Sequence, residues 1–269
     1  MATIAKKAGL ILVASVLALA CFGCSSGGEG KSAEPAAEPK TEVEQGPEKE
    51  EAAEKADPDA EALAAGKTVK YIDQYYTNLK DAVDKANQNG GGTVVLLADT
   101  VDTENGESPT IGFRTSITIK SGDGGPFKVY RADGQANEML RITDGTITVK
   151  DVVFDGSGEG VTSPIVMISD LARVTFGSGL VLTGNASDGS GYAENFGASA
   201  VSISGPDAYV TIESGCMISD CTGSGLAKAA LYNDGANVAN SGGSFSGNTS
   251  ETDTPNYAGT GTYEGDPIA

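Results

Sequence analysis

Histidine and tryptophan are absent from this chain of 269 residues, and only four cysteines are present. Without histidine the chain cannot form a Ser-His-Asp or Cys-His nucleophile pair, an imidazole general base or an imidazole metal ligand. Positive charge is also scarce, because 18 Lys and Arg stand against 37 Asp and Glu, a formal net charge of −19. Nucleic acid is therefore not an expected partner, since phosphate binding needs clustered Lys and Arg.

The first 24 residues have the three-part layout of a secretory signal. Lys6 and Lys7 form a basic start, an apolar stretch covers residues 8–20, and small residues and cysteine follow. The apolar stretch is too short for a comfortable membrane span, which needs ~20 residues. The pattern predicts a signal peptide over residues 1–20 and an exported protein.

A cysteine ends the apolar stretch, where it resembles the lipobox of a bacterial lipoprotein. Cys21, which follows Ala-Leu-Ala, fits the usual small-residue pattern best, and Cys24 is the alternative. The resemblance implies cleavage before the cysteine and diacylation of its sulfur, and two acyl chains hold a protein firmly in a bilayer. We therefore expect a protein anchored in the membrane and exposed at the cell surface. An ordinary secreted protein or a weak membrane helix is the alternative.

Residues 21–66 have the composition of a disordered tether. From residue 25 onward the segment carries 12 acidic and 4 basic residues, a net charge of −8, and almost no large apolar side chain. Such a segment cannot bury enough apolar surface to offset the entropy lost on ordering. We expect an acidic, extended spacer whose charges repel one another.

The pattern changes at residue 67. Apolar residues at helical spacing predict a helix over residues 77–89, which three consecutive glycines end. Short stretches that alternate apolar and polar residues follow, and this alternation predicts strands. The clearest of these stretches cover residues 116–119, 127–130, 146–149, 173–176 and 209–212.

These strands belong to a longer repeat, in which each unit is followed by a loop rich in Gly, Ser and Asp. The units 180–185, 216–221 and 243–248 align at intervals of 36 and 27 residues, and Asp155 aligns upstream of Asn185 at an interval of 30. A period of this length indicates stacked supersecondary units, which bury a continuous apolar column that no single unit forms alone. Such units pair at the normal strand spacing of ~4.8 Å.

The repeat resembles the right-handed parallel β-helices of the pectin-lyase-like class, with the predicted helix in the place of their N-terminal capping helix. Phe245-Ser-Gly-Asn248 is similar to the Phe-x-x-Asn signature of bacterial adhesin-type β-helices, whose Gly-Gly-Ala-Ile signature is only echoed in residues 197–201. The resemblance implies an all-β fold over residues 67–248 with about five or six rungs. A β-sandwich is the alternative. Residues 249–269 are expected to form a flexible tail or a loose cap.

Asn185 and Asn248 occupy the same repeat position, and Cys221 replaces them in the unit between. An amide that donates and accepts suits a ladder of bonds to neighbouring turns, so we expect a structural role for both asparagines. The alignment argues against a disulfide, because five extended residues separate Cys216 from Cys221 by ~16 Å and a bridge needs Cα atoms within ~7 Å. Cys216 is expected to fill the core. A sharp bend between the cysteines would permit the bridge.

Charged side chains give no catalytic pattern. Aspartates are frequent, but the rungs contain no Asp-Asp or Asp-x-Asp pair of the kind that acid–base catalysis or calcium binding uses. We expect solvated turn carboxylates, no catalytic residue, no metal site and no cofactor beyond loosely held calcium. Beyond Arg173 one base stands against ten acids, which disfavours a lyase of anionic pectin. The earlier bases are expected to face outward and pair with neighbouring acids: Arg114, Lys120, Lys128, Arg131, Arg141, Lys150 and Arg173.

Aromatic side chains indicate where a ligand is expected to bind. Tyr192 and Phe196 lie in the longest loop between repeats, together with Asp188. Variable loops of a solenoid gather on one face and commonly carry its function. We place a candidate binding site on these three residues, with packing of the loop on itself as the alternative. Other tyrosines, Tyr257 and Tyr263 among them, are further candidates for stacking on sugars.

Together, these expectations predict a surface-anchored bacterial lipoprotein whose short β-helix binds a glycan or a surface protein. The absence of a converging acid–base constellation favours binding over catalysis. One alternative is a polysaccharide-processing enzyme, a glycosidase or lyase that acts through carboxylates alone. Another is a structural stalk, or a fragment of a larger adhesin. The membrane, through the lipid anchor, is the remaining expected partner.

Overall fold

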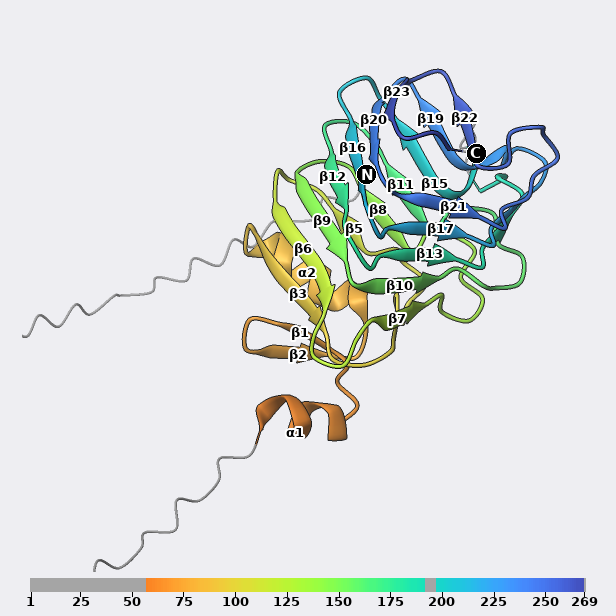
Figure 1. Ribbon diagram of the computed structural model, residues 1–269. Helices are drawn as coiled ribbons and strands as arrows, with labels where there is room; N and C mark the ends of the chain where they lie inside the picture. The colour runs from red at the N-terminus through yellow and green to blue at the C-terminus, as the bar shows by residue number, and fades with distance from the viewer. Residues whose placement is uncertain (1–56, 192–196, 269) are drawn as a thin grey trace, which may run out of the picture. The chain divides into compact units, whose positions relative to one another are not determined.

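The computed structural model describes residues 57–191 and 197–268, which form a parallel β-solenoid of about six turns (Figure 1). Each turn contributes a strand to each of three sheets, named A, B and C in chain order. Sheet A consists, in spatial order, of β2 (Gln74–Tyr76), β1 (Val69–Tyr71), β3 (Gly91–Leu96), β6 (Ser116–Ser121), β9 (Thr146–Lys150), β12 (Arg173–Phe176), β16 (Tyr209–Glu213), β20 (Asn237–Ser241) and β23 (Thr262–Gly265).

Sheet B consists of β4 (Thr100–Val101), β7 (Phe127–Tyr130), β10 (Val152–Asp155), β13 (Val181–Thr183), β17 (Met217–Ser219) and β21 (Ser244–Ser246). Sheet C consists of β5 (Thr110–Ile111), β8 (Leu140–Ile142), β11 (Val166–Ile168), β15 (Ala198–Ser204), β19 (Ala229–Asp234) and β22 (Tyr257–Gly259). A small pair, β14 (Ala186–Ser187) with β18 (Thr222–Gly223), joins two successive loops that follow sheet B. Among the strands of the described residues, the antiparallel pairs are β1 with β2 and β1 with β3. The all-β, solenoid prediction is confirmed, and the β-sandwich alternative is wrong; the right-handedness stays a prediction.

Alternation of side chains explains how each strand of sheet A contributes to the core. Register pairs place Ile117, Ile147, Val174, Val210 and Val238 directly above one another on successive strands, and all five are buried. Each such side chain stabilises the fold by about 1.5–3 kcal/mol when it leaves water. No single turn encloses this column, so stacking itself creates the core.

The corner between sheets A and B explains part of the glycine content. Register in sheet B aligns Asp151, Gly179, Gly215 and Gly242 on successive turns, and all four have positive φ, between 52° and 100°. A Cβ built on Gly179 would lie 2.5 Å from Oδ1 of Asp151. These four turns therefore place a left-handed residue at this corner, and glycine takes that conformation without steric penalty.

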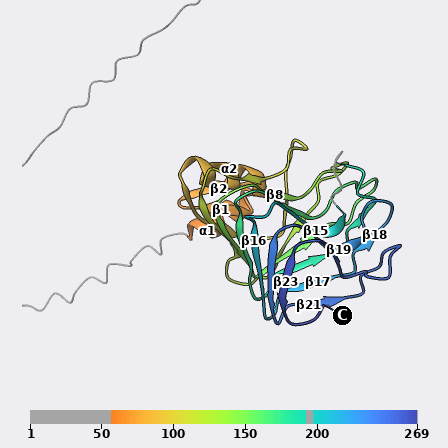
Figure 2. The same ribbon diagram turned by 90° about the horizontal axis from the view of Figure 1, so that it is seen from above.

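Two helices precede the first complete turn. The predicted helix is α2 (Leu79–Gln88), which begins at Asn78, whose side chain accepts a hydrogen bond from the Asp81 backbone at 2.9 Å. Its apolar face, Leu79, Ala82, Val83 and Ala86, is buried in the common core. Figure 2 shows α2 beside β1 and β2, with which it is in contact. Its role as a cap stays a prediction.

The other helix, α1 (Pro58–Ala64), lies within the segment 21–66 that we expected to be a disordered tether. Asp57 caps it and Pro58 opens it, which are ordinary start signals. Its docking explains the difference, because Asp59 Oδ1 lies 2.7 Å from both Nζ of Lys70 and the hydroxyl of Tyr75. These partners come from β1 and β2, so the composition of the segment did not reveal them. Residues 1–56, which include the predicted signal peptide and most of the predicted tether, lie outside the described residues.

The solenoid also continues beyond Asn248, where we expected a tail or a loose cap. Strand β22 pairs in parallel with β19, and β23 pairs in parallel with β20. The segment is poor in apolar residues, but its two tyrosines extend the core columns, as described below. One interval is also corrected: register places Asp155 beside Thr183, not beside Asn185, so these turns are 28 residues apart.

Candidate functional site

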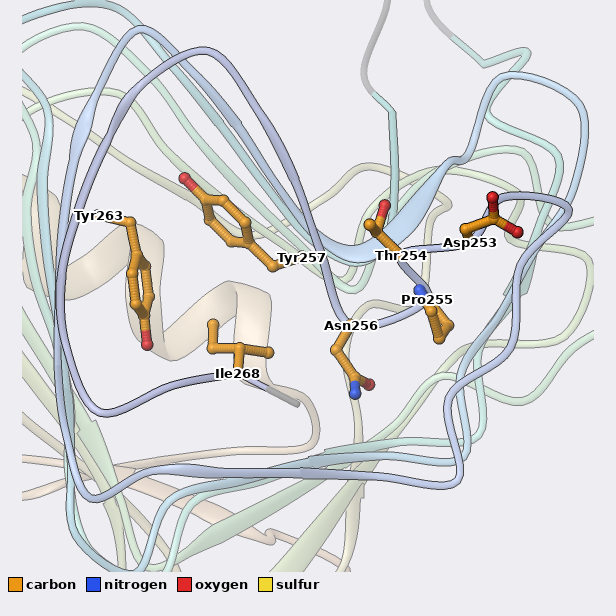
Figure 3. Close-up of a pocket in the computed structure, with 7 residues that line it drawn as sticks. All are labelled: Asp253, Thr254, Pro255, Asn256, Tyr257, Tyr263 and Ile268. Atoms are coloured by element: carbon orange, nitrogen blue, oxygen red, sulfur yellow. The ribbon is translucent and has the colours of Figure 1, made fainter.

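The candidate site is a pocket of about 330 Å³ in the last turn (Figure 3). It is lined by Asp253, Thr254, Pro255, Asn256, Tyr257, Tyr263 and Ile268. Tyr257 belongs to β22 and Tyr263 to β23, and both strands have a neighbour on one side only among the described residues. In the close-up the two rings and Ile268 lie together, with Asp253 and Thr254 on the opposite side.

The two tyrosines occupy core positions of the repeat. Tyr257 stands in register above Leu231 and Tyr263 above Val238, and both lower residues are buried. The tyrosines are only partly buried, since no described strand lies above them. Their ring centroids are 5.0 Å apart and the planes are tilted by 54°, within the usual range for an aromatic pair.

Hydrogen bonds hold both phenols in place. Asn233 Nδ2 donates to the Tyr257 hydroxyl at 3.2 Å, and the Tyr263 hydroxyl donates to the Asp266 carbonyl. Burial, as the largest cause, raises the pKa of Tyr263, so this phenol remains a neutral donor at physiological pH. The pocket therefore contains two aromatic rings whose hydroxyl groups are held in place by hydrogen bonds.

Hydrogen bonds within the last turn and to the turn beneath it fix the polar side of the pocket. Thr252 Oγ1 donates to the Lys228 carbonyl at 2.8 Å, and Asn248 Nδ2 donates to Oδ1 of Asn256 at 2.9 Å. Asp253 is the only ionisable group among the lining residues besides the phenols. Negative charge here disfavours an anionic ligand and leaves neutral or cationic ones.

The loop chosen from the sequence belongs to the same column of loops as this pocket. Tyr192 and Phe196 lie outside the described residues. Asp188 is described, and its carboxylate accepts from the backbone and hydroxyl of Ser190 at 2.8 and 2.7 Å, which lowers its pKa. Leu226 N donates to the Asp188 carbonyl at 2.8 Å, so the loops stack. Sequence reasoning thus identified the correct column of loops, but a loop two turns before the pocket. The signal that it missed is the pair of tyrosines, Tyr257 and Tyr263, at core positions of the repeat.

Asn185 bonds within its own turn and to earlier turns, and Asn248 bonds to the turn before it. The fully buried Asn185 donates to the carbonyls of Ser163 and Ser199 and accepts from Nη2 of Arg131 at 2.9 Å. Asn248 donates to the Ile218 carbonyl and accepts from the Cys221 backbone, each at 3.0 Å.

A buried polar cluster surrounds Arg131, and sequence reasoning missed it. Its guanidinium donates to the Gly156 carbonyl at 3.1 Å and to the Asn137 carbonyl. Burial lowers the pKa of Arg131 to about 10, opposed by the charges of Asp102 and Glu138. Burial also raises the pKa of Asp102, whose Oδ1 accepts from two backbone amides while its Oδ2 has no partner among described atoms. Through its bonds to Gly156 and Asn185, Arg131 joins its own turn to the two turns that follow.

A second pocket, of about 310 Å³ beside α2, gathers three carboxylates but no free acid–base pair. Lys80 Nζ lies 2.6 Å from Asp84 and 3.5 Å from Glu107. Arg141 Nε lies 2.5 Å from Glu138, which is completely buried. Each of the three carboxylates therefore has a Lys or Arg side chain within 3.5 Å.

Cys216 and Cys221 are both free and buried in the core, in agreement with the extended spacing derived from the sequence. Burial raises the pKa of the Cys216 thiol to about 12 and that of Cys221 to about 11. We therefore expect both thiols to be unreactive in the folded protein.

Within the ranges 57–191 and 197–268, no group of three Cys, Asp or Glu side chains lies so as to hold a metal ion. In the same ranges no helix has the length and apolar character needed to cross a membrane. Comparison of the chain with protein-family models, curated proteins and solved structures gave no match.

Proposed function

We propose that this protein is an exported lipoprotein whose β-solenoid binds a neutral glycan in the pocket of the last turn. The observation that carries the proposal is the pair of fixed, partly exposed tyrosines beside amide, hydroxyl and carboxylate groups. Aromatic rings pack against the apolar faces of sugar rings, and convergent polar groups orient the hydroxyls. The acidic surroundings exclude a polyanion from this pocket.

Glycan arrays test the binding proposal. The purified full chain is expected to bind at least one neutral glycan, and Tyr257→Leu with Tyr263→Leu is expected to weaken that binding at least tenfold, about 1.4 kcal/mol. Leucine fills the core positions, so circular dichroism should report an intact fold. Tyr209→Leu, on the outer side of β16, is the matched control. Absence of glycan binding by the full chain, or equal loss in the control, would overturn the proposal.

The anchor has an independent test. Labelled palmitate is expected to enter the full chain when it is expressed in a bacterium, and Cys21→Ser is expected to abolish the labelling. Loss of label in Cys24→Ser alone would move the acylated residue to Cys24. Labelling that survives both changes together would show that neither cysteine is the anchor.

A further inference from the structure

Two pockets adjoin along one side of α2, at the opposite end of the chain from the tyrosine pocket. One is the second pocket described above, of about 310 Å³, and the other has a volume of about 410 Å³. Both are lined by Asp84 of α2 and Thr110 of β5, so they form one continuous groove. We call the two pockets together the α2 groove. Lys80 and Arg141 line only the first pocket, and Gln88 and Phe113 line only the other.

The helical wall of the groove follows from the spacing of residues in α2. Lys80, Asp84, Asn87 and Gln88 recur at helical intervals, so they share one side of the helix. They span ~12 Å along the helix axis, at ~1.5 Å per residue. Asn87 Nδ2 donates to the Thr110 carbonyl at 2.5 Å. This bond holds α2 against β5, so the groove forms without a ligand.

The first pocket contains two cations and three carboxylates, so negative charge is in excess there. Glu138 is completely buried and pairs with Arg141, which confirms that this base has an acidic neighbour. The ammonium group of Lys80 is shared by two carboxylates, since its Nζ lies 2.6 Å from Asp84 and 3.5 Å from Glu107. The side chain of Glu107 is 73% exposed. A cationic ligand can therefore reach the carboxylate that Lys80 holds less closely.

Phe113 borders the other pocket and, at 91% exposed, is the most exposed large apolar residue of the described chain. A single exposed apolar side chain is ordinary on a protein surface. Phe113 differs because it borders a pocket and because its backbone, with φ of 61°, is in the left-handed region that bulky residues rarely adopt. The next residue, Arg114, has φ of 57° and lies 4.0 Å from Asp144. The turn therefore presents an apolar side chain at the edge of the groove.

The two pockets favour different groups of one ligand. Excess negative charge in the first pocket disfavours an anion and favours a cation. Within the ranges 57–191 and 197–268 no group of acidic side chains lies so as to hold a metal ion, whereas an ammonium group needs only acceptor oxygens for its three donors. The second pocket offers Phe113 to an apolar group, which gains by leaving water.

We propose that the α2 groove binds a ligand with an ammonium group at one end and an apolar group at the other. The ammonium group pairs with Glu107 and Asp84, and the apolar group packs against Phe113. The ~12 Å of the helix side matches about three residues of an extended peptide, at ~3.4 Å each. The N-terminus of an apolar peptide and a free aromatic amine both carry this chemistry.

Isothermal titration calorimetry of the full chain tests the proposal with four probes. Ala-Leu-Phe amide carries the ammonium and apolar groups of a peptide, and phenylbutylamine represents a free amine. N-acetyl-Ala-Leu-Phe amide lacks the charge, and triglycine amide lacks the apolar groups. Binding of the first probe, the second or both is expected, and the tighter of the two identifies the source of the ligand. The last two probes should bind at least about tenfold more weakly than that one.

Two variants, each with a matched control, locate the binding site. Glu107→Gln should weaken binding about tenfold, whereas Glu159→Gln, which removes the same charge from another exposed residue, should not. Phe113→Asn should also weaken binding about tenfold, because the apolar contact is lost. Its control is Ile72→Asn, since Ile72 is 60% exposed and has φ of 55°. Asparagine tolerates the left-handed conformation, so circular dichroism should report an intact fold in both.

Three results would overturn the proposal. One is the absence of binding by both the peptide and the amine at millimolar concentration. Another is equally tight binding of the acetylated peptide, because the ammonium group would then not be required. The third is an equal effect of each variant and its control, which would place the ligand outside the groove. The variant with Tyr257→Leu and Tyr263→Leu should retain this binding, so failure here and failure of the tyrosine pocket are distinguishable.

Discussion

Replacing Asn185 by alanine removes three buried hydrogen bonds, two of which, to Ser163 and Arg131, join it to earlier turns of the solenoid. The carbonyls of Ser163 and Ser199 lose a donor, and Nη2 of Arg131 loses an acceptor. Each buried group left without a partner costs about 1–3 kcal/mol, and a charged one costs more. We expect the free energy of unfolding to fall by about 3–5 kcal/mol, at the upper end for a single substitution.

Asn248→Ala provides the comparison within the same repeat position. Asn248 is 8% exposed, and it lies in the last complete turn, so water reaches the groups it leaves behind. Its loss should cost only about 1–2 kcal/mol. Urea unfolding followed by circular dichroism measures the free energy of unfolding of both variants. The dependence of this free energy on urea concentration must be compared as well, since repeat proteins depart from two-state behaviour.

The reasoning would be refuted if Asn185→Ala lost no more stability than Asn248→Ala. A double-mutant cycle sharpens the result: Asn185→Ala and Arg131→Met should couple by about 1 kcal/mol or more, because each removes the other's partner. Additive losses would show that the bond between Asn185 and Arg131 contributes little.

Three further predictions concern other parts of the solenoid. The raised pKa of Asp102 means that the folded state holds the carboxyl proton more tightly than the unfolded state does. The protonated carboxyl therefore contributes stability below the unfolded-state pKa, and this contribution is lost as pH rises through the folded-state pKa. In urea titrations, the free energy of unfolding of the native chain should rise relative to that of Asp102→Asn as pH falls from 7 to 4. Gly179→Ala should cost at least about 1 kcal/mol more than Gly134→Ala, since both have φ of 74° but only the former brings a Cβ within 2.5 Å of another atom; equal losses of melting temperature would refute this. Cys216 and Cys221 should react with a thiol reagent only in denaturant, and rapid labelling of the native chain would contradict their burial.

The sequence was sufficient for the architecture because both of its signals are local. Alternation placed the strands, and the units containing Leu182, Ile218 and Phe245 were aligned in their true register. The alignment failed at Asp155, where the unit lacks the asparagine that marks the units 180–185 and 243–248. The last turn was missed because it carries tyrosine where earlier turns carry aliphatic residues.

The candidate sites were less predictable, because they depend on which turns meet. Arg131 was assigned to the exterior, yet it is buried against Asn185, 54 positions further along the chain. Lys120 and Lys150 were expected to have acidic partners, yet they stand beside each other in register and form no ion pair among the described residues. Composition gives the number of charged residues, whereas the register of the strands determines which of them form ion pairs.

The stacking of turns has a consequence for how ligand binding would be detected. In a solenoid each turn is stabilised by its neighbours, so a turn with one neighbour opens more readily than an internal one. Strands β22 and β23 are in that position among the described residues, and they carry Tyr257 and Tyr263. A sugar bound against these rings would act as the missing neighbour, and it would slow hydrogen exchange of the amides in these two strands while leaving those of β9 and β12 unchanged.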